Sequence, residues 1–223
     1  QASELTGCNI YGKAEYFNPG ESVKDRAALF IVQDALKKKL ISKGGTIVEG
    51  TAGNTGIGLA IVCKEYDLKL KIVIPKTQSI EKKETLKKLG AELIEVEAVP
   101  YANPKNYIKQ SKQIAEDLKK TTLNGVYWAN QFDNVVNTES HIQTTAEEIW
   151  NQTAGTVDGF TCSVGTGGTL AGVSIGLKNK KKNIKIALSD PMGSALYSHI
   201  KNNKLESAGS SITEGIGNGR ITK

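Results

Sequence analysis

The chain has 223 residues, 39% of them hydrophobic, which is enough for the core of one large or two small domains. Its net charge of +6 comes mainly from lysine runs at the ends of helix-like segments, with few aromatic residues among them, so we expect no nucleic-acid partner. The absence of a long apolar run argues against a membrane span, and three scattered cysteines with two histidines argue against a zinc site and favour reduced thiols in the cytoplasm.

Short β-rich runs alternate with longer helix-like runs. Residue preferences predict strands at residues 9–17, 46–49, 70–74, 92–96, 126–129, 159–164 and 184–188. Apolar periodicity predicts helices at residues 23–40, 55–66, 80–89, 104–120, 138–152, 169–178 and 194–202. This alternation predicts an α/β fold with a parallel sheet and helices on both faces. The chain begins at Gln1 and stops at Lys223 in a polar stretch, so we expect it to be truncated at both ends.

The first long helix begins in an unusual sequence. Ser22 and Asp25 have the spacing of a capping box, which predicts a helix start at Val23. Lys24 then falls in the first turn, where the helix dipole and other cations favour the neutral amine. A neutral amine is a nucleophile for carbonyl groups. The alternative is that Lys24 is an ordinary solvated residue.

The loops that follow the strands are the places where open α/β sheets bind ligands. Residues 165–169, with the sequence GTGGT, follow a strand and open a helix, so their N–H groups could bind a phosphate. They do not form a dinucleotide fingerprint, because Leu170 stands where that motif has glycine. A tight turn without a ligand is the alternative.

Two other loops could bind a carboxylate. Residues 50–56, with the sequence GTAGNTG, offer N–H groups, the Thr51 hydroxyl and the Asn54 amide, although an ordinary helix cap explains the same pattern. Residues 130–134 include Gln131, which could donate to an anion, but a surface turn is the simpler interpretation. We expect His141 to lie on a helix surface or to pack, without a catalytic role.

Together these features favour one class of ligand. A readily discharged lysine, a phosphate loop and a carboxylate loop suit a phosphate-bearing aldehyde cofactor, for which pyridoxal 5'-phosphate is the obvious candidate. An anion-binding module without chemistry would leave Lys24 unexplained.

Four motifs occur in the order found in one family of enzymes. They are NPGxSVKDR at residues 18–26, EGTAGNTGIG at 49–58, GTGGT at 165–169 and EGIG at 214–217. The chain thereby resembles the cysteine synthase (O-acetylserine sulfhydrylase) and cystathionine β-synthase family of pyridoxal-phosphate enzymes. The resemblance implies a tryptophan synthase β-like fold of two three-layer α/β/α domains with twisted, mostly parallel sheets. It implies a smaller, mobile substrate-carboxylate domain at residues 30–135, and a larger cofactor domain at residues 1–29 plus 136–223 that is incomplete at its C-terminal end.

The resemblance also implies a role for individual residues. Lys24 would be the catalytic residue, bonding the cofactor as a Schiff base and later acting as a base. Asn54 would hydrogen-bond the 3′-oxygen of the cofactor, and Gly215 would approach its ring. The cofactor phosphate would be held by Gly165, Thr166, Gly167, Gly168 and Thr169, and the substrate carboxylate by Thr51, Gly53, Asn54, Thr55 and Gln131. No metal is expected.

The implied reaction is β-replacement on an activated serine, with cysteine synthesis from O-acetylserine and sulfide as the favoured form. The alternatives are cystathionine β-synthase-like or cysteine desulfhydrase chemistry on the same fold, and a silent homologue that acts as a binding partner. Ala52 stands where the family usually has serine, which removes one hydroxyl near the substrate carboxylate and leaves the identity of the donor open. The resemblance further implies a cytoplasmic homodimer, with serine acetyltransferase as a further candidate partner.

Overall fold

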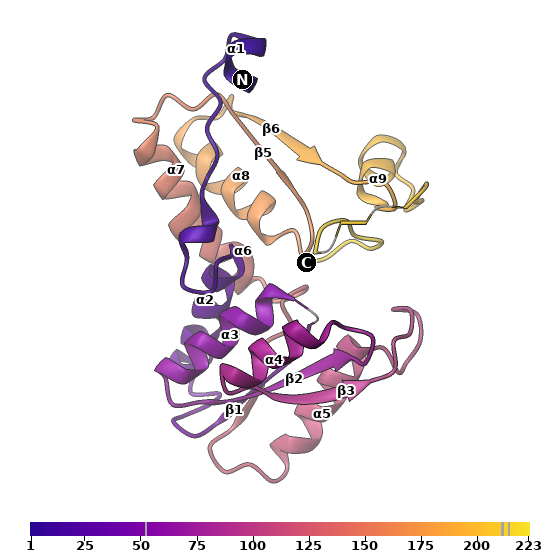
Figure 1. Cartoon of the computed structure of the whole chain (residues 1–223). Coiled ribbons are helices and arrows are strands. Elements are labelled where there is room, and N and C mark those ends of the chain that lie inside the picture. Colours follow the sequence, from indigo (N-terminus) through magenta and orange to yellow (C-terminus); the bar gives the residue numbers. More distant parts are fainter. Residues whose placement is uncertain (52, 211, 214) are drawn as a thin grey trace.

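The chain forms two α/β units in a computed structural model that describes residues 1–51, 53–210, 212–213 and 215–223 (Figure 1). The first unit holds a four-stranded parallel sheet in the order β3-β2-β1-β4, and the second holds the parallel pair β5-β6. The parallel pairing confirms the predicted α/β class. The strands are β1 (Thr46–Gly50), β2 (Lys69–Pro75), β3 (Glu92–Val96), β4 (Val126–Trp128), β5 (Gly159–Ser163) and β6 (Lys185–Ser189).

Helices connect the strands at the places that the periodicity predicts. The helix predicted at residues 138–152 is divided, because a π-helical turn (His141–Thr145) lies between two α-helical segments. A short helix at the N-terminus was not predicted. The helices are α1 (Ala2–Thr6), α2 (Lys24–Lys37), α3 (Asn54–Glu65), α4 (Ile80–Lys88), α5 (Tyr107–Lys119), α6 (Val136–Ser140), α7 (Ala146–Gln152), α8 (Gly168–Lys180) and α9 (Leu196–Asn202).

Residues 9–17 do not form the predicted strand, so this prediction was wrong. They run without regular structure into a 3-10 turn (Glu15–Phe17). Tyr11 and Tyr16 are exposed, and none of the described strands pairs with this segment. Aromatic and β-branched residues favour strands only where a neighbouring strand offers pairing and burial, which this segment lacks.

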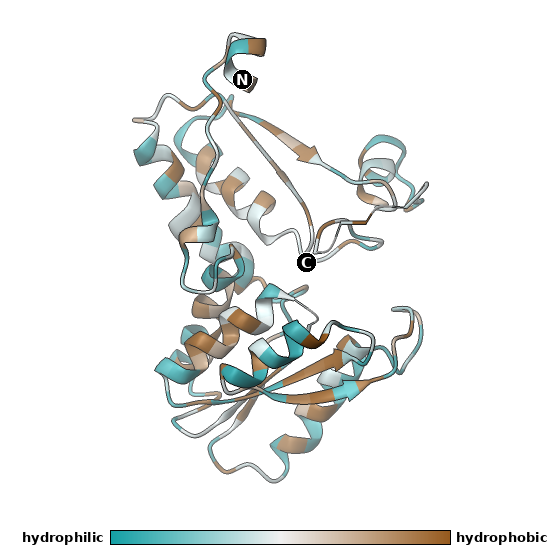
Figure 2. Cartoon of the chain, in the orientation of Figure 1, coloured by the Kyte–Doolittle hydropathy of each residue, from teal (hydrophilic) through white to brown (hydrophobic). Residues whose placement is uncertain are grey.

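The main core lies between the four-stranded sheet and the helices α2 and α3. Ile31, Ile47 and Leu59 are fully buried there, and burial of each such side chain contributes about 1.5–3 kcal/mol. The opposite face of the sheet packs on α5 through a smaller cluster that includes Val48. Figure 2 shows hydrophobic residues concentrated along the strands and on α2 and α3. Because β1 is covered on both faces, all its residues are buried.

In the second unit, α8 packs closely on the helical segments that precede it. A Cβ at Gly172 would meet the Thr138 carbonyl and the His141 side chain, and a Cβ at Gly176 would meet Ala146. Glycine at these positions lets the helices approach, and Leu177 of α8 is fully buried. The N-terminal half of α8 is thereby fixed against the π-helical turn.

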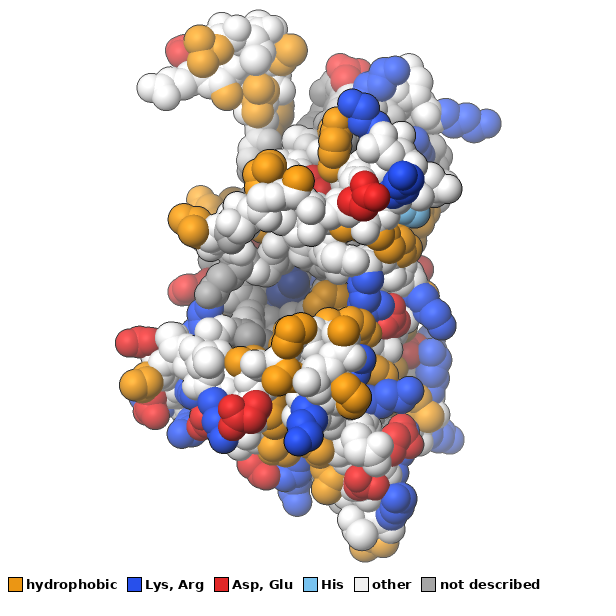
Figure 3. All heavy atoms as spheres, turned by 90° about the vertical axis from the view of Figure 1, so that its right-hand side faces the viewer, with side chains coloured by type: hydrophobic (Ala, Val, Ile, Leu, Met, Phe, Trp, Pro, Cys, Tyr) orange, Lys and Arg blue, Asp and Glu red, His pale blue; other side chains and the backbone are white. Residues whose placement is uncertain are grey.

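The two units meet where α2 packs against α6. The loop that follows β5 and the N-terminal end of α3 lie at this level (Figure 1), and the surface is hollowed there (Figure 3). The junction therefore brings together loops that follow strands of both sheets. Within the described residues, no helix combines the length and apolar character needed to cross a membrane.

Candidate active site

Lys24 is the first residue of α2, one residue later than the capping pattern predicts. Its side chain is partly buried, and burial lowers its pKa from the ordinary value, while the Cys162 thiol opposes the shift. The direction agrees with the prediction, and the main cause is loss of solvent on burial. In the described part of the chain, no hydrogen bond or ion pair reaches Nζ. A partly desolvated amine of lowered pKa is well suited to attack a carbonyl group.

The start of α2 is held by contacts other than the predicted capping box. The Asp25 carboxylate accepts the N–H of Gly20 at 2.5 Å, while Ser22 Oγ accepts the N–H of Lys24 at 3.3 Å. A Cβ at Gly20 would collide with this carboxylate, and a Cβ at Gly58 of α3 would also press on it. Two glycines therefore let the loop and α3 close around Asp25, next to Lys24.

An ion-pair network joins the beginning of α2 to α7. The Arg26 guanidinium bonds Glu15 at 2.8 Å and Glu148 at 2.6 Å, and Lys13 reaches Glu148 at 2.6 Å. The hydrogen bond from Arg26 lowers the pKa of Glu148 to about 2, with a further contribution from Lys13. The network fixes the helix that carries Lys24 against the second unit.

The loop predicted to bind a carboxylate joins β1 to α3. Thr51 is buried, and its Oγ1 accepts the N–H of Gly53 at 3.2 Å. Asn54 is the first residue of α3 and its side chain is exposed. No side chain of the described residues caps this helix, so the N–H groups of its first turn suit an anionic ligand. Ala52, the departure from the family pattern, lies outside the described residues.

Gln131, in the loop after β4, lies beside the start of α3. Its Oε1 accepts a hydrogen bond from Thr55 Oγ1 at 2.5 Å, and both side chains are buried. The structure thus brings together two residues that are 76 positions apart and that were both predicted to hold the substrate carboxylate. In this arrangement the Gln131 Nε2 group is the donor of the side chain, and it bonds the Glu49 carboxyl.

Glu49 is a buried acid that lies next to this loop at the end of β1. It is 1% exposed, and burial raises its pKa to about 8, although the amides of Asn130 and Gln131 oppose the shift. Its Oε2 has no hydrogen-bond partner within the described residues. Glu49 is therefore mainly a neutral acid at pH 7. The sequence motif contained this residue but gave no reason to assign it a role.

The glycine loop at residues 165–169 connects β5 to α8. Gly167 has φ of +94°, a conformation that favours glycine, and α8 begins at Gly168 with no side-chain cap among the described residues. Thr166 Oγ1 accepts the N–H of Gly168 at 3.4 Å. An uncapped N-terminus preceded by glycines is well suited to bind a phosphate.

The segment that carries Gly215 lies against the glycine loop. The Gly217 N–H donates to the Val164 carbonyl at 2.7 Å, and Thr222 Oγ1 donates to the Thr166 carbonyl at 2.7 Å. A Cβ at Gly165 would collide with the Gly215 carbonyl. Glu214, which belongs to the same motif, lies outside the described residues.

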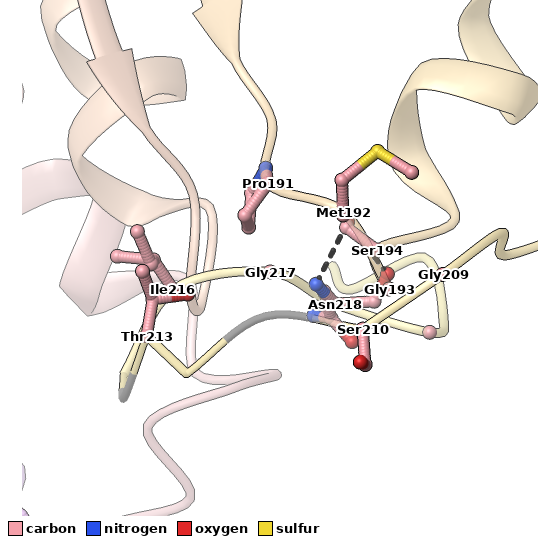
Figure 4. A pocket seen from close by; sticks show the side chains of 11 residues that line it. Pro191, Met192, Gly193, Ser194, Gly209, Ser210, Thr213, Ile216, Gly217 and Asn218 are labelled. Carbon is pink, nitrogen blue, oxygen red and sulfur yellow. Dashed lines mark hydrogen bonds between the residues drawn. The ribbon is translucent and has the colours of Figure 1, made fainter.

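A pocket lies beside this segment, lined in part by Pro191, Met192 and Ile216 (Figure 4). Across it, the Asn218 N–H donates to Ser194 Oγ at 3.0 Å. Asn218 Nδ2 also donates to the Gly165 carbonyl at 3.0 Å. One wall of the pocket is therefore bonded directly to the glycine loop.

His141 lies in the π-helical turn and is only 2% exposed. Its Nε2 lies 3.2 Å from Thr169 Oγ1, and its Nδ1 lies 2.8 Å from Thr145 Oγ1. Burial lowers its pKa to about 4, with smaller contributions from the charges of Arg26 and Lys24. A packed histidine was one of the expectations, but its contact with the glycine loop was not foreseen.

Asn137 of α6 joins the two predicted anion-binding regions. Its Nδ2 donates to the Gln131 carbonyl and to Thr166 Oγ1, each at 3.0 Å. Its side chain is buried. Nothing in the local sequence distinguishes Asn137 from the turn-forming asparagines just before it, so sequence reasoning missed it.

Arg220 was also missed. Its guanidinium bonds both oxygens of Asp133, at 3.0 and 2.9 Å, and lies over the rings of Tyr101 and Phe132 at 5.1 and 5.4 Å. The hydrogen bond from Arg220 lowers the pKa of the Asp133 carboxyl. Arg220 therefore ties the C-terminal segment to the loop that carries Gln131, through bidentate and stacking contacts that arginine alone provides.

The assembled residues fit a phosphate-bearing aldehyde. The Lys24 amine, which is partly desolvated and has no partner among the described residues, matches the aldehyde. The start of α8, which none of these residues caps, matches the phosphate. The uncapped start of α3 offers a second anion site for a carboxylate. Among the described residues, no group of three or more His, Cys, Asp or Glu side chains could hold a metal ion.

Comparison with known proteins gives one consistent result. All residues 1–223 match the family described as "Pyridoxal-phosphate dependent enzyme". Cysteine synthase 1 of Neurospora crassa is 54% identical over 223 residues, which cover 99% of this chain and 58% of that protein. The chain thus spans less than two thirds of the length of this relative.

Solved structures agree. O-Acetyl Serine Sulfhydrylase isoform 3 from Entamoeba histolytica has a TM-score of 0.79 at 38% identity, covering 94% of this chain and 59% of that one. The O-acetylserine dependent cystathionine beta-synthase from Helicobacter pylori has a TM-score of 0.82 at 34% identity, covering 95% of this chain and 65% of that one. Both similarities extend over almost all of the chain.

Proposed function

Because the chain belongs to the family of pyridoxal-phosphate dependent enzymes, we propose that the protein synthesises cysteine from O-acetylserine and sulfide by β-replacement. The observation that carries the proposal is Lys24, whose pKa is lowered by burial and whose helix packs against α3 and α6. The 54% identity to a cysteine synthase supports the choice of reaction.

The cofactor, when bound, supplies an aldehyde that bonds amines and a ring that accepts the electron pair left behind by a departing α-proton. Lys24 would hold it covalently through Nζ, and Asn54 would donate to its 3′-oxygen. The N–H groups of residues 165–169 and the Thr166 and Thr169 hydroxyls would hold its phosphate, as the uncapped helix start suggests. Gly215 would leave room for the ring.

The donor carboxylate would bind at the start of α3. The N–H groups of Gly53, Asn54 and Thr55, with the Thr51 hydroxyl, would form one side of this site. Gln131 Nε2 would donate its second hydrogen from the other side, since Gln131 Oε1 is engaged by Thr55 and the first hydrogen bonds the Glu49 carboxyl. This arrangement would orient the α-carbon and exclude water.

Lys24 would then act as a base. The Lys24 Nζ would take up the proton from the α-carbon of the donor amino acid, which would allow the β-substituent to leave. Because burial lowers the pKa of Lys24, more of this amine is neutral near pH 7 than in water. Sulfide would then bond the β-carbon in place of the group that left.

The domain division remains part of the proposal. Residues 30–135 would form the smaller, mobile unit that closes over the donor, and residues 1–29 with 136–223 would belong to the larger cofactor unit. The bond between Arg220 and Asp133 joins the two and would favour closure. A cytoplasmic homodimer and an acetyltransferase partner rest on the family resemblance.

Other reactions on the same scaffold are the alternatives. Similarity to an O-acetylserine dependent cystathionine beta-synthase favours an enzyme with the same donor but a larger thiol in place of sulfide. Cysteine desulfhydration would use the same residues in the reverse sense. A silent homologue would retain the fold without needing a dehydrated Lys24.

A substrate panel distinguishes these reactions. The full-length protein, loaded with pyridoxal phosphate, is given O-acetylserine with sulfide, O-acetylserine with homocysteine, and cysteine alone, and the products are quantified. The proposal predicts that cysteine formation has the largest kcat/KM. Faster cystathionine or sulfide formation would transfer the assignment to the corresponding alternative, and no turnover with any pair would support a silent homologue.

A further inference from the structure

Asn137 occupies a singular position between the two loops of the site. It lies in α6, is 4% exposed, and its Nδ2 donates at 3.0 Å to the Gln131 carbonyl and at 3.0 Å to Thr166 Oγ1. These acceptors are 35 residues apart, 6 and 29 positions from Asn137 in opposite directions along the chain. A single side chain thus spans the loop proposed for the carboxylate and the loop proposed for the phosphate.

The orientation of the Asn137 amide is determined by its surroundings. The Gln131 carbonyl can only accept a hydrogen bond, so the NH₂ group of Asn137, and not its oxygen, has to face it. The same NH₂ group then supplies its second hydrogen to Thr166 Oγ1. Both donors of the amide are therefore used in the bridge.

This bridge has a consequence for the Thr166 hydroxyl. Thr166 Oγ1 accepts from Asn137 Nδ2 and, at 3.4 Å, from the Gly168 N–H, which uses both of its lone pairs. No acceptor for the hydroxyl proton occurs among the described residues. The proton is therefore available to an anion bound at the start of α8.

The remaining side of the Asn137 amide packs on the glycine loop. A Cβ built at Gly168 would collide with the Asn137 carboxamide. Gly168 is buried and its φ is not positive, so glycine is needed here for close approach rather than for backbone conformation. Asn137 and Gly168 are thus fitted to each other.

We infer that Asn137 is a positioning residue that couples the phosphate loop to the carboxylate loop, an inference that rests on the proposed function. It holds the Thr166 hydroxyl as a donor to the phosphate, and it holds the Gln131 backbone so that the Gln131 amide meets the carboxylate. Removing its NH₂ group leaves a buried carbonyl unpaired and lets the Thr166 proton turn away from the phosphate. Both binding events should then weaken together.

The test uses the full-length protein and two equilibrium measurements. The first is the ratio of affinities for pyridoxal phosphate and pyridoxal, read by protein fluorescence, which isolates the contribution of the phosphate. The second is the affinity of the loaded protein for L-serine, read by cofactor absorbance. Asn137→Ala, Thr166→Ala and Gln131→Ala are compared with wild type, and the exposed Asn151→Ala serves as the control.

We expect Thr166→Ala to lower only the phosphate ratio and Gln131→Ala to lower only the affinity for serine. Asn137→Ala should lower both, each by about tenfold, because a buried hydrogen bond is lost at each end. The double variant Asn137→Ala/Thr166→Ala should show no weaker phosphate binding than the weaker single variant, since the two side chains act as a unit. If the two substitutions instead weakened phosphate binding independently, through a general loss of stability, the fold-changes of the single variants would multiply in the double variant.

The inference is overturned if Asn137→Ala changes only one affinity or neither, or if the effects of Asn137 and Thr166 multiply. If Asn137→Ala does not fold, judged by circular dichroism, Asn137→Asp replaces it, because this change keeps the size but removes the donor. The same double loss is then expected, and its absence is equally decisive. Wild-type protein that binds neither form of the cofactor would overturn the proposed function itself.

Discussion

Thr55 Oγ1 donates to Gln131 Oε1 at 2.5 Å, so two residues expected to bind a ligand are first bonded to each other. This bond uses the Thr55 hydroxyl proton and leaves the Gln131 Nε2 group as the donor, which also bonds the Glu49 carboxyl and so has one hydrogen left for a ligand. Thr55 can then serve a carboxylate through its backbone N–H at the start of α3. A bound carboxylate would therefore receive a side-chain hydrogen bond from Gln131 and backbone N–H hydrogen bonds from the start of α3.

Gln131→Ala should raise the KM for O-acetylserine by about tenfold, because one hydrogen bond to a charged carboxylate is lost. The affinity for pyridoxal phosphate should stay within about twofold of wild type, since the side chain faces the other loop. Steady-state kinetics and cofactor titration check both values. The exposed Gln113→Ala on α5 is the control and should change neither. An unchanged KM would remove Gln131 from the carboxylate site.

Lys24→Ala should lower turnover by about a thousandfold or more, because it removes both the covalent attachment and the base. Lys37→Ala, at the exposed end of the same helix, should keep the wild-type rate. Product formation by the full-length protein measures both variants. Wild-type turnover by Lys24→Ala would refute the assignment.

Glu49→Gln should remove a pH dependence of stability. The folded protein holds the pKa of Glu49 at about 8, above the ordinary value of 4.5, so its contribution is complete below pH 4.5 and is lost as the pH rises through 8. Between these values wild type should lose about 1.4 kcal/mol of unfolding free energy per pH unit, whereas Glu49→Gln should not. Urea unfolding at pH 6 and pH 8 measures the difference.

The exposed Glu65→Gln on α3 is the matched control for Glu49 and should follow wild type at both pH values. If Glu49→Gln loses as much stability as wild type between pH 6 and pH 8, then Glu49 is ionised in the folded protein. In that case the amides of Asn130 and Gln131 would outweigh burial.

Gly168→Ala should destabilise the protein by about 1–3 kcal/mol, because the added methyl group collides with the buried Asn137 amide. Gly12→Ala, where an added Cβ meets no atom within 4 Å, should be neutral or slightly stabilising. Denaturant unfolding of both variants checks this. Equal stabilities would mean that Asn137 moves aside at no cost, which is incompatible with a fixed bridge.

The fold could be predicted because its signals are local. Apolar runs such as β2 and the periodic apolar face of α2 persist in the structure, with Ile31 and Val32 fully buried. The strand predicted at residues 9–17 was wrong because a strand forms only beside a neighbouring strand, and residue preferences carry no information about neighbours. The π-helical turn at His141 could not be predicted either. It lies where Gly172 of a different helix packs closely on the Thr138 carbonyl, and this contact has no local sequence pattern.

The candidate site has features that the sequence predicts where they depend on backbone chemistry. Uncapped helix starts preceded by glycines are recognisable in sequence, and so is a lysine at an unfavourable helix position. The hydrogen bonds Asn137–Thr166 and Arg220–Asp133 were missed because they join segments 29 and 87 residues apart. Side chains that connect distant loops leave no periodic or local pattern.

The most direct measurement identifies the lysine that carries the cofactor. The full-length protein is loaded with pyridoxal phosphate, reduced with borohydride, digested and mapped by mass spectrometry. We expect the reduced cofactor on the peptide that contains Lys24, and its loss from that peptide when O-acetylserine is added before reduction. Attachment to another lysine, or to none, would contradict the assignment of Lys24 and the reaction built on it.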